Sequence, residues 1–443
     1  MNNYMLMAGM ALSALAGTPR SGLGQAEPLT LERARAEART GSLDALAARA
    51  RARAAEAGRG AQGSFLWPQL ALEAGAVRSD DPVAAFGGRL RQGAFTEADF
   101  DPARLNDPGA LTDWSGAVGV SWAPLDASAA AAYSASALEA DAAARGAEWA
   151  TRAAIFRAEA LYMAAEGAEG RLTAARSAGE AGEATLALVE RRAAEGLLTD
   201  ADALQARAAA EGARARVIDA ERAVADARAR LRVALGWPQD RVPVPVDTVF
   251  GTAATEGSGL DGRADLEASS LGVRAAEARL RQATRARLPT VRGFARLETH
   301  SASAFSDARG DWTAGFVVGV PVFAGFSIRS RERAAGALLE ASRREHELRV
   351  MEAGAQVQEA RRGLEAARRG AEAAQSAAEA ADEAARLMRL RFEQGLITTA
   401  DLLGAESVAA ALRTQAVDAR LQSSLAAARL AFLTDTTTED LDR

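Results

Sequence analysis

Hydrophobic and polar residues alternate with a period of two in four short segments of this chain. In the clearest segment, Trp114, Val118, Val120 and Trp122 are separated by small or polar residues. Alternation over about ten residues predicts β-strands, and this length also suits a tilted strand that crosses a membrane. The predicted strands span residues of about 65–77, 114–124, 289–300 and 312–323.

The two faces of these strands differ in chemistry. One face is apolar, and tryptophans lie at or near the strand ends, where aromatic girdles of membrane strands belong. The residues predicted to face lipid or to form the girdles are Trp67, Trp114, Val118, Val120, Trp122, Trp312, Phe316, Val318 and Val320. The opposite face carries Arg292, Arg296 and Glu298, which are predicted to line water. The same alternation also fits half-buried strands of a soluble sheet, and that alternative stays open here.

Two long intervals, residues 125–237 and 322–443, contain no proline. They are rich in Ala, Glu, Arg and Leu, a composition typical of long helices and coiled coils, and proline is the strongest helix breaker. A helix over residues 127–195 would be roughly 100 Å long. Heptad positions predict where the following helix packs: Val217, Ala220, Val224, Ala227, Leu231 and Ala234.

The chain is a tandem repeat. The letters RAAEA occur at 53–57 and again at 274–278, and DW occurs at 113–114 and 311–312. Each copy reads helix, strand, strand, long helix, turn, helix. We therefore predict a first repeat at 27–236, an inter-repeat linker at 237–262, a second repeat at 263–435 and a C-terminal tail at 436–443.

Four membrane strands cannot close a barrel, because known single-chain barrels start near eight strands. Open strand edges are not tolerated in lipid. A membrane protein of this pattern must therefore associate, and each chain adds four strands. Three chains would give twelve strands and a lumen that side chains do not fill, whereas two would give eight and a nearly solid interior.

Composition and charge exclude several functions. The 443 residues include no cysteine and no lysine, and the net charge is −6, which argues against a nucleic-acid partner. With no thiolate and only two separated histidines, His300 and His346, we expect no metal site, no cofactor and no enzymatic activity. Residues 1–26 resemble a signal peptide with an apolar run from Met5 to Ala16, so we expect export.

Two similar motifs interrupt the proline-free intervals. Gly196, Leu197, Thr199 and Asp202 recur in the same spacing as Gly395, Leu396, Thr398 and Asp401. Such a glycine can end a helix in the left-handed conformation. The threonine can cap the next helix, and the aspartate then lies in its first turn, where the helix dipole favours an anion. This structural explanation is sufficient for both aspartates.

The chain resembles the TolC-like outer-membrane efflux family. The resemblance rests on PLTLERARAEA at 28–38, VPVFAGFSIRSR at 320–331, the two glycine motifs and the doubled layout. It implies a mainly α fold with a transmembrane β-barrel: twelve strands per homotrimer in outer-membrane lipid, above a tunnel of α-helical coiled-coil hairpins in the periplasm. It also implies a periplasmic adaptor and an inner-membrane transporter as partners, with the protein as the passive exit duct of a tripartite efflux pump or type I secretion system.

The same resemblance gives the glycine motifs a second interpretation. It places them at the periplasmic hairpin tips, near 196–202 and 395–401, with Asp401 and Asp202 as periplasmic gate residues. The adaptor would contact Gly196, Leu197, Thr199, Gly395, Leu396 and Thr398. A second gate aspartate, frequent in the family three residues after the first, is replaced here by Gly404. The alternative to a channel is a soluble coiled-coil scaffold or filament protein.

Overall fold

The structure, a computed structural model, describes residues 25–248, 259–304 and 308–434. Four long helices dominate these residues: α5 (Ala127–Ala194), α6 (Asp200–Ala234), α8 (Ser327–Glu393) and α9 (Thr399–Leu433). Their bounds confirm the prediction from the proline-free intervals. The predicted order of helix, two strands, long helix, turn and helix occurs twice along the chain.

The chain divides into two compact units, and each unit takes segments from both sequence repeats. The first unit comprises Met1–Leu43, Ala154–Ala253 and Leu364–Ala428, and the second comprises Asp44–Ala153, Ala254–Gly363 and Arg429–Arg443. The predicted signal peptide falls mostly on residues 1–24, and the predicted tail is residues 436–443. Both of these stretches lie outside the described residues.

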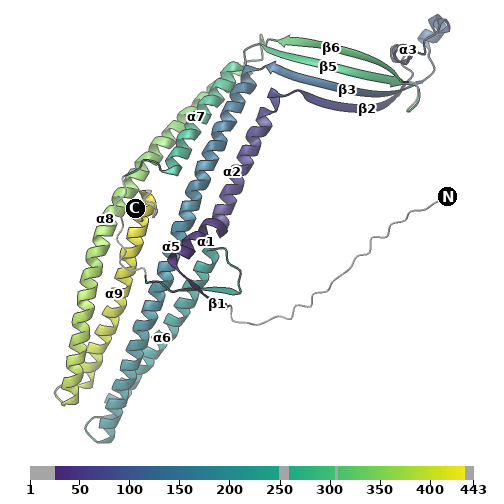
Figure 1. Cartoon of the computed structure of the whole chain (residues 1–443). Coiled ribbons are helices and arrows are strands. Elements are labelled where there is room, and N and C mark those ends of the chain that lie inside the picture. The colour runs from purple at the N-terminus through teal and green to yellow at the C-terminus, as the bar shows by residue number, and fades with distance from the viewer. Residues whose placement is uncertain (1–24, 249–258, 305–307, 435–443) are drawn as a thin grey trace, which may run out of the picture. The chain divides into compact units, whose positions relative to one another are not determined.

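The second unit contains an antiparallel four-stranded sheet in the order β2-β3-β5-β6 (Figure 1). Its strands are β2 (Gln69–Ser79), β3 (Leu111–Leu125), β5 (Thr290–Ser301) and β6 (Arg309–Gly319). All four predicted strands are confirmed. The last one was predicted to reach residue 323 but ends at Gly319, because Pro321 has no N–H to donate and Gly325 and Phe326 adopt φ values of 59° and 62°.

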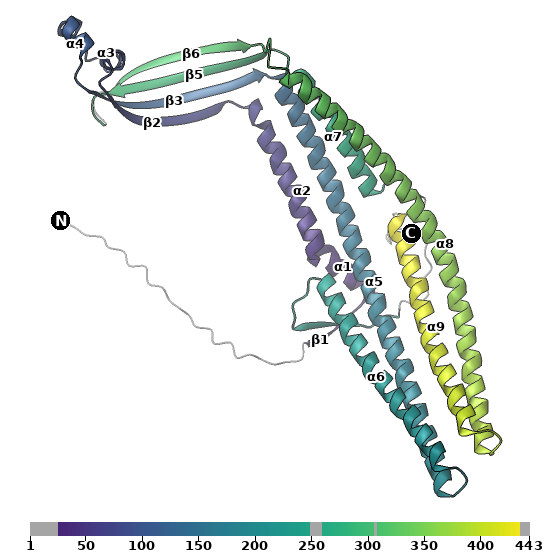
Figure 2. The same cartoon turned by 180° about the vertical axis from the view of Figure 1, so that it is seen from behind.

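Helices α2 (Leu43–Gln62) and α7 (Ala264–Arg285) precede the two strand pairs. A 3-10 turn, η1 (Gly63–Leu66), joins α2 to the sheet. The connection between β2 and β3 folds into α3 (Pro82–Arg91), the 3-10 turn η2 (Glu97–Phe100) and α4 (Pro102–Asn106), none of which was predicted from the sequence. Figure 2 shows α3 and α4 beyond the ends of β2 and β3.

The first unit contains a small parallel sheet that the sequence did not predict. Strand β1 (Gln25–Leu29) pairs with β4 (Arg241–Pro245), and α1 (Leu31–Gly41) follows β1. Arg241 donates two hydrogen bonds to Glu27, at 2.8 and 3.0 Å. Arg241, and after it Arg33, lower the pKa of Glu27 to about 2. Part of the predicted linker 237–262 therefore forms a strand that pairs with the start of the first repeat.

Small residues allow the helices of the first unit to approach closely. Gly167 and Gly170 of α5 lie against Leu421 and Val417 of α9, and Arg171 forms an ion pair with Asp418 at 2.7 Å. The predicted heptad on α6 is confirmed here as a packing surface. Val224 is buried with Ala168 and Leu172 of α5, and Val217, Ala220 and Ala227 pack around them.

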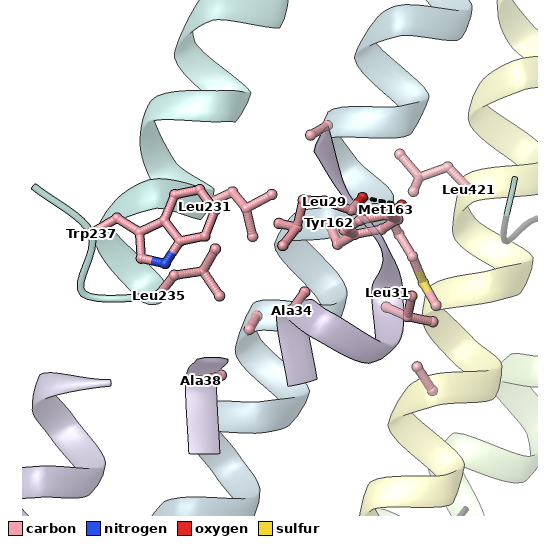
Figure 3. Packing of buried hydrophobic residues seen from close by; sticks show 13 residues of the cluster. Leu29, Leu31, Ala34, Ala38, Tyr162, Met163, Leu231, Leu235, Trp237 and Leu421 are labelled. Atoms are coloured by element: carbon pink, nitrogen blue, oxygen red, sulfur yellow. Dashed lines mark hydrogen bonds between the residues drawn. The ribbon is translucent and has the colours of Figure 1, made fainter. Parts of the chain in front are cut away.

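The largest fully buried side chain of the described residues is Tyr162 on α5. It lies in a hydrophobic cluster with Leu29, Met163, Leu231 and Leu421 (Figure 3). Its hydroxyl donates to the Leu29 carbonyl at 3.0 Å and accepts from the amides of Val246 and Asp247 at 3.3 and 3.1 Å. One phenol therefore joins α5, β1 and the segment after β4, and burial raises the pKa of this hydroxyl.

We expect Tyr162→Phe to destabilise the protein by about 0.5–1.5 kcal/mol, the usual net contribution of a hydrogen bond, because it removes the bonds of the hydroxyl to the Leu29 carbonyl and the Asp247 amide. Denaturant or thermal unfolding of the purified protein measures this loss. Tyr133→Phe is the matched control, since Tyr133 is only half-buried and lies beside the guanidinium of Arg59. Equal stability of the Tyr162 and Tyr133 variants would show that the hydroxyl does not join these segments.

Candidate functional site

Both glycine motifs form the turns of helical hairpins, as predicted. Gly196 and Gly395 each have φ of 74°, the left-handed region that glycine adopts at little cost. After α5, the amide of Leu197 bonds to the Arg192 carbonyl at 2.9 Å, and the amide of Gly196 bonds to Ala193 at 2.9 Å. The second turn repeats these two bonds after α8. The pattern is a Schellman motif, which satisfies the last carbonyls of a helix.

The threonine and aspartate of each motif form a capping box at the start of the returning helix. Asp202 accepts from the Thr199 amide at 3.0 Å and from its hydroxyl at 2.6 Å. Asp401 accepts from the Thr398 amide at 3.0 Å and from its hydroxyl at 2.7 Å. In return, each threonine oxygen accepts from the amide of its aspartate. The predicted structural explanation of the two aspartates is therefore confirmed.

The hydrogen bonds from Thr199 and Thr398 lower the pKa of Asp202 and Asp401 respectively. A carboxyl whose pKa is lower in the folded state stabilises that state above its unfolded pKa of about 3.9. This contribution disappears as the pH falls through the lower, folded-state pKa. We expect amide hydrogen exchange at both turns, corrected for intrinsic rates, to accelerate below about pH 4.

Asp401→Asn gives an internal control for this pH dependence. The asparagine oxygen still accepts from Thr398 but does not titrate in this range, so the second turn should lose its pH dependence while the first turn keeps it. Protection that does not change with pH at either turn in the native protein would contradict the role of the ionised caps.

The two turns also pack together within the first unit. Val189, Ala206, Phe392 and Leu402 form a buried cluster that joins the ends of the two hairpins. Arg192 donates to the carbonyl of Phe392 at 2.5 Å and to that of Glu393, at the end of α8. Leu197 and Leu396, by contrast, are 69% and 68% exposed. Each turn therefore presents one leucine to solvent.

Sheet register places the predicted strand faces as expected. Paired residues of neighbouring strands point to the same side of a sheet. Val118 pairs with Leu72 and with Leu297, and Leu297 pairs with Trp312. On the same face lie Trp114, Val120, Trp122, Phe316 and Val318. Two residues of the predicted lipid-facing set lie outside the strands: Trp67 precedes β2 and Val320 follows β6.

The opposite face carries the predicted polar residues Arg292, Arg296 and Glu298. Arg296 forms ion pairs with Glu298 on its own strand and with Glu73 of β2, the latter at 2.8 Å. A second polar pair, His300 and Asp113, lies at one end of this face and was not predicted from the sequence. His300 is 5% exposed, and its Nδ1 lies 2.8 Å from Asp113. The period-two pattern would have placed both on the polar face, but their pairing across β3 and β5 needs the register.

Among the described residues, no group of three or more His, Asp or Glu side chains is arranged to hold a metal ion. No helix in the described part of the chain is both long and apolar enough to cross a membrane.

Comparison with known proteins identifies the family. A family described as outer membrane efflux protein matches residues 34–237 and 258–435. The chain belongs to this family. Membership makes it an outer-membrane efflux channel rather than a soluble scaffold, in a family of ducts rather than of enzymes. A search of curated proteins gives no significant match.

Solved structures share the fold of this efflux protein at low sequence identity. The CmeC outer membrane channel of Campylobacter jejuni superposes with a TM-score of 0.80 at 16% identity, over 98% of this chain and 94% of that one. A membrane protein from Pseudomonas aeruginosa gives 0.78 at 20% identity, over 91% and 93%. The outer membrane protein VceC from Vibrio cholerae gives 0.74 at 18% identity, over 91% and 95%. The TolC-like fold expected from the sequence is thus confirmed.

Proposed function

We propose that the protein is a homotrimeric channel-tunnel. In this proposal, the four-stranded sheet of each chain forms one third of a 12-stranded barrel in the outer membrane. The hairpins α5–α6 and α8–α9 form a tunnel in the periplasm. The whole is the passive exit duct of a tripartite efflux pump or a type I secretion system, from the cell to the exterior.

The observation that carries this proposal is a sheet with one apolar face that is exposed and two edges that are open. Leu72, Trp312 and Phe316 are 81%, 76% and 77% exposed. Within the described residues, β2 and β6 each pair on one side only. Exposed apolar surface of this kind marks a membrane or protein contact. Pairing β6 of one chain with β2 of the next satisfies both edges, and lipid covers the apolar face.

The tryptophans support a membrane-spanning band of the right thickness. Trp114 and Trp122 lie on the apolar face of β3 and are eight residues apart. A strand rises about 3.3 Å per residue, so roughly 26 Å separates them. With the strand tilt of about 35–45° found in outer-membrane barrels, this length corresponds to roughly 20 Å along the membrane normal, close to the apolar band of about 25 Å. Trp312 pairs with Leu297 and therefore lies level with Val118, four residues from Trp114, whereas Phe316 lies level with Trp122.

In the same assembly, the polar face with Arg292, Arg296 and Glu298 lines the water-filled lumen. The turns at Gly196 and Gly395 form the periplasmic tip. The exposed Leu197 and Leu396, together with Thr199 and Thr398, supply contacts for a periplasmic adaptor protein. Asp401, fully at the surface of its turn, and Asp202 contribute a ring of carboxylates that attracts cations at the entrance. The inner-membrane transporter supplies the energy.

Cross-linking between edge strands tests the trimer. Because the chain has no cysteine, any introduced pair is the only one. A series that combines Leu72→Cys on β2 with Trp312→Cys, Ala314→Cys or Phe316→Cys on β6 scans the register between chains. We expect oxidation of at least one pair to give bands up to a trimer and no further. Cross-linked bands larger than a trimer would indicate an open filament and would contradict the closed barrel.

A further inference from the structure

The connection between β2 and β3 is a folded element with its own stabilising contacts. Asp81 accepts from the Ala84 amide at 2.8 Å, and Asp101 accepts from the Ala103 amide at 3.0 Å. Each aspartate caps a helix whose first residue is proline, the arrangement that favours a helix start. We refer to residues 80–110 as the insertion, because the corresponding connection after β5, residues 302–308, is far shorter.

Internal contacts hold the insertion in one conformation. Arg89 forms an ion pair with the buried Asp99 at 2.6 Å, and Asp99 also accepts from the Thr96 amide at 2.8 Å. Phe95 contacts Phe86 and Phe100 edge-on, at 4.9 and 5.1 Å between ring centroids. Aromatic pairs of this geometry stabilise beyond the area they bury. These contacts all lie within the insertion and stabilise its fold.

One end of the insertion is anchored to the polar face of the sheet. At the end of α3, the Gln92 amide nitrogen lies within hydrogen-bonding distance of the Thr112 carbonyl at 2.9 Å, the Asp113 carboxylate at 2.9 Å and the Ser301 carbonyl at 3.3 Å. The other oxygen of Asp113 faces His300 at 2.8 Å. Asp113 and His300 both point to the polar face, so Gln92 approaches the sheet from that side.

Two close contacts confirm this side. A Cβ on Gly93 would collide with the side chain of Arg309, and one on Gly88 would collide with that of Leu111. Arg309 is the register partner of His300, and Leu111 lies two residues before Asp113 on β3, on the same face. Both therefore point to the polar face as well. The side chains of Arg309 and Leu111 therefore pack directly against the insertion at Gly93 and Gly88.

We propose that the insertion is a fixed constriction at the outer mouth of the channel, where it sets the upper size of the solutes that pass. This inference rests on the proposed trimer, in which the polar face lines the lumen. The strand ends that carry the insertion are opposite the ends that join α2, α5, α7 and α8, so the insertion lies at the exterior end. Three copies, each anchored on the lumen side, narrow the same mouth.

Polymer exclusion in planar bilayers tests the constriction. Polyethylene glycols of graded mass, added to one chamber, reduce channel current only when they enter the channel from that side. The variant replaces residues 80–110 with Asn-Gly, because Ser79 and Leu111 are register partners and such a pair suits a two-residue hairpin turn. We expect the mass cut-off on the sheet side to shift to larger polymers, with the cut-off on the tip side unchanged.

A milder change keeps the test decisive if the shortened protein does not assemble. Gln92→Ala removes the anchor but leaves the insertion intact, and we expect it to raise both the sheet-side cut-off and the current noise. Gln69→Ala is the matched control, since Gln69 lies on the same face at the opposite end of the sheet, and it should leave the sheet-side cut-off unchanged.

The outcomes separate this inference from the proposed function. Native channels whose sheet-side cut-off equals that of the shortened protein and of Gln92→Ala would overturn the constriction while leaving the channel intact. Native protein that forms no channels at all would instead overturn the proposed function, and the constriction with it. A shift confined to the sheet side in either variant supports the constriction.

Discussion

Val120→Arg is expected to block assembly of the protein in the outer membrane. Val120 lies on the apolar face of β3, between Trp114 and Trp122, and pairs with Leu70 and Ala295. Arginine on the lipid face of a membrane strand costs about 2–4 kcal/mol near the bilayer midplane and less toward the interfaces, and Val120 lies two residues from Val118, the midpoint between Trp114 and Trp122. A trimer would bear this cost three times, which is comparable to the whole stability of many folded domains. The measurement is the amount of trimer in outer-membrane fractions.

The adjacent residue supplies the control. Ser121 is exposed on the polar face of the same strand, so Ser121→Arg should assemble normally. A second variant tests how the effect depends on depth in the membrane. Val318 is 57% exposed and lies on the apolar face of β6. Val318→Arg should be milder than Val120→Arg, because Val318 lies nearer the strand end and the cost of arginine falls near the interface. Normal assembly of Val120→Arg, or equal defects in Val120→Arg and Ser121→Arg, would refute the lipid-facing assignment.

Asp401→Ala is expected to reduce the preference of the channel for cations by about fivefold at low salt, because three carboxylates would leave the narrow end of the proposed trimer together. Reversal potentials across a salt gradient in planar bilayers measure this preference. The effect should shrink as ionic strength rises, since the Debye length falls to about 8 Å at 0.15 M.

Asp401→Asn separates charge from capping. Its side-chain oxygen can still accept from the amide and hydroxyl of Thr398, but it carries no charge. If the ring of charge acts on permeation, the Ala and Asn variants lose cation preference equally. If the aspartate acts only as a cap, the Asn variant keeps the native preference, and the gate assignment is wrong.

The strands and their faces were predictable because both follow from the alternation of apolar and polar residues along a short stretch of sequence. Trp114 to Trp122 alternates without a break, and the register then placed Val118 and Phe316 on one face. The long helices were predictable from the absence of proline, and their ends from Gly196 and Gly395. These features use short stretches of sequence whose physical preference agrees with the final fold.

Two elements escaped prediction for different reasons. Strands β1 and β4 hold Pro28, Pro243 and Pro245 in five-residue segments. Proline suggests a break rather than a strand, and only the partner strand, far away in sequence, stabilises the pairing. The helices of the insertion are short, but Asp81-Pro82 and Asp101-Pro102 each combine a good cap with proline at the first helical position. That signal was present and could have found them.

The contacts that join distant segments could not be predicted from local patterns. Three contacts join residues that are far apart in sequence. They are the hydrogen bonds of Tyr162 to β1 and to the segment after β4, the bond of Arg192 to the end of α8, and the bonds of Gln92 to the sheet. The motifs at the turns predicted caps but not that Leu198 and Ile397 pack around the buried cluster between them. Tertiary packing decides such contacts.

The mass and symmetry of the detergent-extracted protein test the central claim most directly. Light scattering, corrected for detergent, combined with negative-stain images of material from the outer-membrane fraction, gives both quantities. We expect an elongated particle with three-fold symmetry and the protein mass of three 46.0 kDa chains, less any cleaved signal peptide. A water-soluble rod of two chains, or an open-ended filament that needs no detergent, would contradict the channel.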